Sequence, residues 1–172
     1  MSLTKVTYSM ISGAELNVLD FGAVSGSDST SAIANAIAAL PATGGAIYFP
    51  KGTYITDAIT LPVYPKCVTF FGDGRQVSLL KPRSQNQKLI QSAGIVSGIG
   101  GTRFEMRHMG IVPHASGSTG MAIDMRNMSA SIFFDVAFVS NNLATFDVGF
   151  ELFADDTPGA EINCYYNVFK EI

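Results

Sequence analysis

The stretch Asn17–Ala23, NVLDFGA, followed by Asp28–Ile33, DSTSAI, and by Gly44–Tyr54, GGAIYFPKGTY, decides the fold of this chain. In the third piece the apolar residues Ile47 and Phe49 alternate with other side chains, which is typical of a β-strand. The three pieces together predict a turn, the start of a short helix and the first strand of a sheet.

A helix of about three turns is predicted over Ser29–Leu40, which is rich in alanine. Its larger apolar residues fall at helical spacing: Ile33, Ile37 and Leu40. Pro41 and the pair Gly44-Gly45 end it. Three residues can supply the oxygen that caps the free amides of its first turn: Asp28, Ser29 and Thr30.

Short strands separated by turns are predicted after Gly45. A period of two places one set of residues on the inner face: Ile47, Phe49, Tyr54, Thr56, Val68, Phe70 and Leu79. The turns contain Gly or Pro, as in Gly72-Asp73-Gly74, where we expect both glycines to accept the positive φ of a sharp corner. Turns at this spacing suit the corners of a solenoid.

A weak internal repeat supports a solenoid in the last third of the chain. The segments 103–111, 132–139 and 164–169 each join an apolar strand to a polar residue and an apolar continuation. The polar residues His108, Asp135 and Asn167 are 27 and 32 residues apart, within the period of stacked coils. We expect 121–125 and 146–153 to form a second strand of successive coils, on another face.

Composition excludes several classes of protein. A chain of 172 residues with 47% apolar and 15% charged residues is expected to fold as one domain. A net charge of −3 offers no basic surface, so we expect no nucleic-acid partner. The sequence has no apolar run of about 18 residues and no secretory signal, so we expect no membrane segment and synthesis in the cytoplasm.

No cofactor or metal site is expected. Cys67 and Cys164 lack a paired spacing and are predicted to be small buried apolar residues. His108 and His114 are six residues apart, which matches no common metal-binding spacing. We expect His108 to lie in a side-chain ladder or a turn.

The motifs above, in this order, resemble the start of right-handed parallel β-helix proteins of the pectate-lyase type, especially the tailspikes and capsule depolymerases of bacteriophages. The match runs from about Asn17 to Lys81. It rests on these positions: Asp20, Phe21, Gly22, Ala23, Gly44, Gly45, Phe49, Pro50, Gly52, Tyr54, Gly72 and Gly74. The chain departs from the family at Ser25–Thr30, where members usually carry more acidic residues. The segment Thr4–Ala14 also resembles the short leader that precedes this motif in many phage tail proteins.

The resemblance implies an all-β fold, a right-handed parallel β-helix with an N-terminal arm and one short capping helix. We expect residues 1–17 to be the arm that attaches to other virion tail proteins, 18–45 to hold the turn motif and the capping helix, and 46–172 to form the first coils. The sequence reads as strand up to Ile172. We therefore expect either a fragment or a C-terminal end that another chain covers.

The function implied is that of the N-terminal part of a tailspike, a homotrimer in the virion tail that recognises and depolymerises bacterial surface polysaccharide. We expect attachment and scaffold roles for this chain, with the active site elsewhere in the protein. Two alternatives stay open: a non-catalytic virion structural or adaptor protein, and a bacterial pectate-lyase-like enzyme that degrades polysaccharide.

Depolymerases of this type either hydrolyse a glycosidic bond with two carboxylates about 5 to 10 Å apart or cleave by β-elimination with a base, often helped by an arginine or a metal. On a β-helix the carboxylate spacing means the same face of adjacent coils. Four acids are candidates: Glu105, Asp135, Glu151 and Asp155. Glu105 and Asp135 are expected on neighbouring coils, as is Glu151 with Asp155 or Asp156. An error of one residue in the register moves a side chain to the other face. Solvated acids on strands and turns are the competing interpretation.

Overall fold

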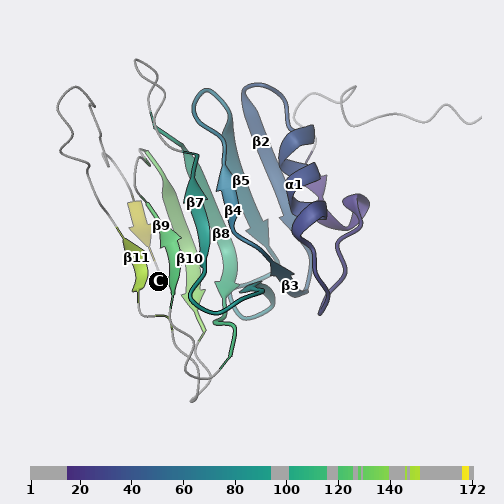
Figure 1. Ribbon diagram of the computed structural model, residues 1–172. Helices are drawn as coiled ribbons and strands as arrows, with labels where there is room; N and C mark the ends of the chain where they lie inside the picture. Colours follow the sequence, from purple (N-terminus) through teal and green to yellow (C-terminus); the bar gives the residue numbers. More distant parts are fainter. Residues whose placement is uncertain are drawn as a thin grey trace, which may run out of the picture.

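The chain forms a right-handed parallel β-helix, as the sequence predicts (Figure 1). The computed structural model describes residues 15–93, 101–115, 120–125, 128, 130–139, 146, 148–151 and 168–170. Within this part of the chain, every paired strand runs parallel to its neighbour. Stacked coils therefore hydrogen-bond one to the next, and α1 (Thr30–Ala39) lies at one end of the stack.

Two sheets form the walls of the solenoid. Sheet A contains β1 (Leu16–Asn17), β2 (Gly44–Phe49), β3 (Gly52–Thr56), β5 (Cys67–Gly72), β6 (Ser78–Pro82), β8 (Phe104–Ile111), β10 (Ile132–Phe138) and β12 (Val168–Lys170). Sheet B contains β4 (Ile59–Leu61), β7 (Lys88–Ser92), β9 (Met121–Asp124) and β11 (Val148–Glu151), in the order β11-β9-β7-β4. Sheet A bends into two walls, one running β1-β2-β5-β8-β10-β12 and one in which β6 pairs with β3 and with the end of β8.

Inward side chains stack along the axis because partner residues of parallel strands share a face. In sheet A, Ile47, Phe70, Met106 and Phe133 are partners on successive strands, and all four are fully buried. Phe70 also meets the rings of Phe49 and Phe104 edge to face, with centroids 4.9 and 5.2 Å apart. Such ring pairs add about 0.5–1.5 kcal/mol each to the burial of their area.

The N-terminal motif folds into a tight turn before the helix. Asn17 Oδ1 accepts a hydrogen bond from the Leu19 amide at 3.0 Å and begins the 3₁₀ helix η2 (Val18–Phe21). Gly22 ends η2 with a φ of 93°, a left-handed conformation that glycine adopts without a steric cost. This explains the glycine of the DFGA motif.

The helix α1 matches the predicted segment to within one residue at each end. Asp28 acts as the side-chain cap, since its Oδ1 accepts hydrogen bonds from the Thr30 amide at 2.9 Å and from the Thr30 hydroxyl at 2.6 Å. Ile33 and Leu40 are buried, and Ile37 packs against the core. The apolar face of the helix thus covers the first coil.

The inner face of β6 differs from the prediction. Leu79 is half-buried and points away from the core, whereas Leu80 and Ser78 are fully buried. Ser78 can lie inside because its hydroxyl donates to the Phe49 carbonyl at 2.8 Å and accepts from the Asp73 amide at 2.9 Å. These bonds satisfy a polar side chain that the sequence pattern places outside.

The two glycines of Gly72-Asp73-Gly74 serve different purposes. Gly74 has a positive φ of 152°, as predicted. Gly72 is not among the described glycines with a positive φ. A Cβ at Gly72 would lie 2.4 Å from Ser78 Cβ, so it is glycine because the next strand passes too close for a side chain.

The corner between the two walls of sheet A varies in length along the stack. It contains Pro50–Lys51 in the first coil and Asp73–Val77 in the second. In the next two coils a single residue makes it, His108 in β8 and Asp135 in β10, each with a φ of 51°. These two residues are 27 apart, as predicted for the repeat.

The predicted step to the following coil is wrong. Ile132 is paired with Val168, so this step is 36 residues (132 to 168) rather than 32. Asn167 itself lies outside the described residues. The second strands of these coils are confirmed as β9 and β11, which pair in sheet B.

Candidate functional site

Every strand of sheet B carries a polar residue at the same register position. Thr60 is paired with Gln91, Gln91 with Asp124 and Asp124 with Glu151. Thr60 is exposed between the buried residues Ile59 and Leu61, so its side chain faces outward. We call Thr60, Gln91, Asp124 and Glu151 the polar column.

The polar column contains a buried ion pair. Asp124 is only 2% exposed, and its Oδ2 lies 2.7 Å from Nζ of Lys88, which is partly exposed. A buried carboxylate requires such a partner, because an unpaired charge in the interior is costly. In the same column Gln91 Nε2 donates to Thr60 Oγ1 at 3.1 Å. Side chains from three coils are thus fixed in position.

The backbone of the polar column places two carboxylic acids on adjacent coils. Asp124 and Glu151 are register partners, and neighbouring strands lie about 4.8 Å apart. Glycoside hydrolysis uses two carboxyl groups about 5 to 10 Å apart, one as acid and one as nucleophile or base. The backbone register brings these two positions onto adjacent strands, as such a pair requires. Of the predicted catalytic candidates, Glu151 is the one whose register partner is another acid, Asp124.

Glu105 lies on the outer face of sheet A and is held by its neighbours. Its Oε2 accepts a hydrogen bond from the Thr69 hydroxyl at 3.2 Å, and its Oε1 forms an ion pair with Arg107. The partner of Glu105 on β10 is Ile132. The carboxylate thus helps to join β5 to β8 on this face.

Asp135 is on the adjacent coil, at the corner. Its Oδ2 lies 2.8 Å from Nδ1 of His108 and its Oδ1 lies 3.4 Å from Nε of Arg75. Three residues separate it from Ile132, which corresponds to about 10 Å of strand. Glu105 and Asp135 are thus on neighbouring coils, and each is bound to its own side-chain partners. Their catalytic role stays a prediction, and Asp155 and Asp156 lie outside the described residues.

The outer face of sheet A also carries an aromatic pair. Tyr48 and Phe71 stack with centroids 5.1 Å apart and an angle of 26° between their planes, so that one face of each ring is covered. The Tyr48 hydroxyl donates to Asp73 Oδ1 at 2.5 Å, and this hydrogen bond raises the pKa of Tyr48. The pair stabilises the wall and leaves less ring surface for stacking on a sugar.

Neither a metal cluster nor a membrane-spanning helix is found in the part of the chain that the structure describes. Cys67 is half-buried rather than buried, with Sγ 3.6 Å from the Pro65 carbonyl oxygen. Cys164 lies outside the described residues.

Comparison with known families agrees with this architecture. The model of the rhamnogalacturonase A/epimerase, pectate lyase-like family matches residues 16–132. The chain belongs to this family. No curated protein matches it.

A solved structure is similar to this pectate lyase-like chain: ORF18 of Geobacillus virus E2, with 22% sequence identity and a TM-score of 0.58. The similarity covers 71% of this chain and 25% of the viral one, so the chain spans about a quarter of the length of that protein. At this identity the likeness shows a shared fold.

The sequence analysis missed Asp124, Lys88 and Gln91. Asp124 ends the apolar run of β9, and Lys88 begins β7, so neither resembles a site in isolation. The signal lies in the register of sheet B, where one polar residue recurs on each strand of the pectate lyase-like coil. Loops of unequal length hide this recurrence from the sequence.

Proposed function

We propose that this chain is the N-terminal part of a phage tailspike whose polar column binds bacterial surface polysaccharide. Two findings support the phage assignment at a coarse level: the pectate lyase-like family and the similarity to a phage protein. The observation that carries the proposal is the polar column, which follows the solenoid axis over four strands of sheet B.

The column suits a polymer of sugars for a geometric and a chemical reason. Its described side chains offer the hydroxyl of Thr60, the amide of Gln91 and the partly exposed amine of Lys88, which is paired with the buried Asp124. Sugar hydroxyls both donate and accept hydrogen bonds, so they match this mixture of groups. An extended chain laid along the axis meets a new coil about every 4.8 Å.

Within the virion, the proposed role of this chain is attachment and scaffolding. The part of the expected 1–17 arm that precedes β1 attaches to another tail protein, since Leu16 and Asn17 pair with β2, and the complete protein is a homotrimer. Cleavage by the chain itself would use Asp124 and Glu151 as the carboxylate pair, with Lys88 paired to Asp124. If this carboxylate pair is inactive, the depolymerase activity lies in another part of the complete tailspike.

The test is binding of purified capsular polysaccharide and lipopolysaccharide, measured by calorimetry with the chain and two variants. Gln91→Ala removes a column amide that contacts Thr60. Thr69→Ala removes a sheet A hydroxyl that contacts Glu105 and is the matched control. We expect Gln91→Ala to weaken binding about two- to tenfold, the effect of one lost hydrogen bond, and the control to bind normally. Equal loss in both variants would contradict the proposed surface.

The alternatives give different outcomes in two further measurements, which are light scattering and the release of reducing or unsaturated sugar ends. A stable trimer that neither binds nor cleaves any polysaccharide supports a virion structural or adaptor protein. Cleavage by a protein secreted in the absence of phage particles supports a bacterial enzyme. Sugar release that stops in Glu151→Gln supports catalysis by the column.

A further inference from the structure

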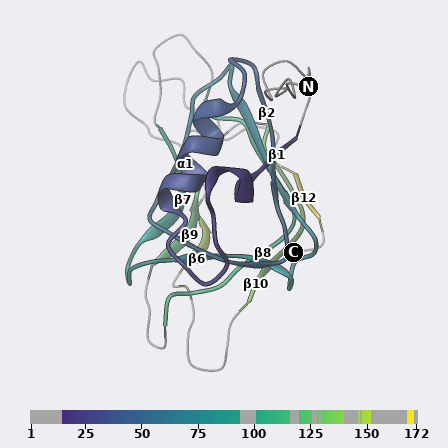
Figure 2. The ribbon, with the colours of Figure 1, turned by 90° about the vertical axis from the view of Figure 1, so that its right-hand side faces the viewer.

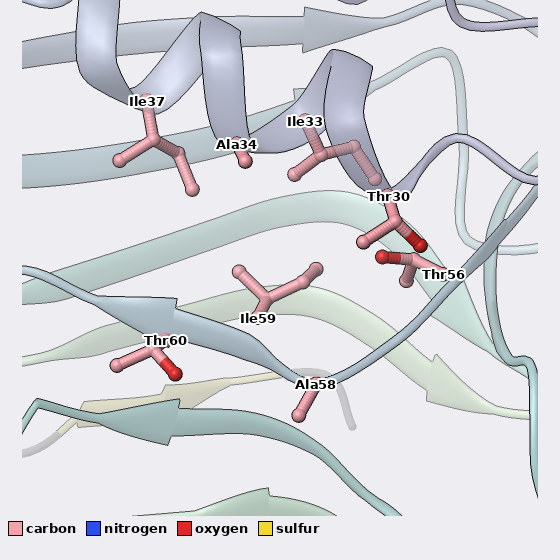
Figure 3. A pocket seen from close by; sticks show the side chains of 8 residues that line it. All are labelled: Thr30, Ile33, Ala34, Ile37, Thr56, Ala58, Ile59 and Thr60. Atoms are coloured by element: carbon pink, nitrogen blue, oxygen red, sulfur yellow. The ribbon is translucent and has the colours of Figure 1, made fainter.

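The polar column ends at an apolar groove beside the helix. β4 is the terminal strand of sheet B, and α1 lies on the side of the molecule where β7 and β9 of that sheet are labelled (Figure 2). The groove lies between α1 and β4, and Thr60 belongs both to the column and to its lining (Figure 3). A polymer that follows the column therefore reaches this groove at the N-terminal end of the stack.

The walls of the groove are largely aliphatic, and its volume is about 150 Å³. Ile33 and Ile37 reach from the helix toward Ile59 on β4, and the small side chain of Ala34 leaves the space between them. A site of this size and lining holds an apolar group up to about the size of benzene. A methyl group fits it, whereas a carboxylate would lose its hydration against these side chains.

The threonines that line the groove are bonded within the protein. Thr30 accepts from the Asp57 amide at 2.9 Å, and Thr56 donates to the Asp57 carbonyl at 2.9 Å. Thr60 is exposed and accepts from Gln91, and a hydroxyl that accepts one hydrogen bond can still donate its hydrogen to a ligand. An acetyl group matches this arrangement, because its carbonyl accepts such a hydrogen bond and its methyl group is apolar.

Two basic side chains close to sheet B are bound to acids. Lys88 Nζ lies 2.7 Å from Oδ2 of the buried Asp124. Arg83, in the corner that leads from β6 into β7, has nitrogens 2.7 Å from a carboxylate oxygen of Asp28 and 2.7 Å from one of Asp57. The first pair is neutral, and the second group has one negative charge in excess. Neither group presents a net positive charge to an incoming anion.

Two further charged residues lie at the borders of sheet B. Lys66 follows β4, and its Nζ donates to the Ala38 carbonyl of α1 at 3.3 Å. Glu151, the register partner of Asp124, adds an acid to the last strand of the column. A polymer of uronic acids carries a carboxylate on each sugar, so several of its charges would meet these acids. Two like charges 4 Å apart repel by about 1 kcal/mol even in bulk water.

We propose that the polar column takes a neutral polysaccharide and that the acetyl group of one sugar lies in the groove beside Thr60. This inference rests on the proposed function, because it names the ligand of the same surface. Two separate observations support it, which are the apolar groove at the end of the column and the pairing of Lys88 and Arg83 with acids.

The experiment compares three forms of one polymer by calorimetry with the full chain. The first is an acidic, O-acetylated capsular polysaccharide. The second is the same polymer after its carboxylates are reduced to alcohols under conditions that keep the acetyl esters, and the third is the reduced polymer after mild alkali removes these esters. We expect the second form to bind about tenfold more tightly than either of the others.

Two pairs of variants test the groove and the charge separately. Ala34→Phe fills the groove, and Ala39→Phe adds the same bulk to an exposed position of α1 outside its lining. Asp57→Asn removes the excess negative charge beside Arg83, and Glu15→Gln makes the same change just before β1 of sheet A. Ala34→Phe should weaken binding of the second form about tenfold, and Asp57→Asn should strengthen binding of the first form about two- to fivefold. Both controls should bind like the parent chain.

The outcomes separate this inference from the proposed function. Tighter or equal binding of the acidic form overturns the neutral ligand and leaves the proposed polysaccharide surface standing. Equal binding of the second and third forms, or normal binding by Ala34→Phe, overturns the acetyl site in the groove. If none of the three forms binds, the proposed function fails and this inference fails with it.

Discussion

On the outer face of sheet A, polar and charged side chains are bound to one another within the wall: Arg107 to Glu105, and both His108 and Arg75 to Asp135. In sheet B, polar residues are register partners from strand to strand, and Asp124 is buried and paired with Lys88. The inner faces of both sheets are apolar, with Phe70 and Ile90 as fully buried examples.

This difference between the two sheets shows that the outward side chains of a repeated coil can serve two purposes. In sheet A the outward charges are neutralised locally, so they hold adjacent strands together. In sheet B polar residues recur at one register position along the axis, and the proposed polysaccharide surface rests on this recurrence. The fold repeats the same backbone hydrogen bonds in both walls, and the outward side chains determine what each wall does.

The largest effect is expected from Phe70→Ala, which tests whether the aromatic core of sheet A dominates stability. Phe70 is fully buried and contacts the rings of Phe49 and Phe104. Its loss should lower the free energy of unfolding by about 3–5 kcal/mol. Denaturant unfolding measures this change. Val77→Ala, at an exposed position, is the control, and a comparable loss there would contradict the assignment.

A smaller effect is expected from Asp124→Ala, which removes the acid from the polar column. It leaves Lys88 without its partner at 2.7 Å, so the free energy of unfolding should fall by about 1–3 kcal/mol. Asp124→Asn keeps the shape and should lose less. The comparison of the two variants by thermal unfolding tests the ion pair, and an unchanged or higher stability in Asp124→Ala would show that the pair is retained for another purpose.

A third change tests the outer face of sheet A. Asp73 accepts hydrogen bonds from the Tyr48 hydroxyl at 2.5 Å and from the Lys51 amide at 2.8 Å. Asp73→Ala should cost about 1 kcal/mol and should lower the pKa of Tyr48 toward its ordinary value. Ultraviolet titration of the tyrosines follows this pKa. A Tyr48 titration that does not move would contradict the role of Asp73.

The smallest effect concerns pH at the helix cap. Hydrogen bonds from Thr30, and then Arg83, hold the pKa of Asp28 below its ordinary value of 3.8. The folded state therefore favours the ionised form, so the stabilisation is present above pH 3.8 and is lost as the pH falls through the lower folded pKa. When thermal unfolding is measured across acidic pH, the melting temperatures of the parent chain and of Asp28→Asn should converge in this range. A constant difference between them would exclude the cap as its source.

The sequence predicted the solenoid because its signals are local. The DFGA turn, the alanine-rich helix and the period-two strands each depend on a few consecutive residues, and α1 begins at Thr30, within one residue of the predicted start. Leu79 was misplaced because a buried serine, Ser78, shifts the register by one and depends on the Phe49 carbonyl of the preceding coil.

The candidate site could not be predicted in the same way. Asp124 becomes notable only beside Gln91 and Glu151, and their alignment depends on the lengths of the loops between coils. The sequence identified Glu151 as one acid of a pair but gave no register to find the other. Pairing across coils is a tertiary property, so a single sequence leaves it undetermined.

The corner of sheet A has a practical consequence for anyone who wishes to rebuild this protein. It contains two residues in the first coil, five in the second and one at His108 and Asp135, yet the strands on either side stay in register. A corner that already varies in size without disturbing its neighbours is a natural point for grafting. Peptides or reporter domains inserted between Gly74 and Val77 would be displayed at a fixed height on a rigid rod.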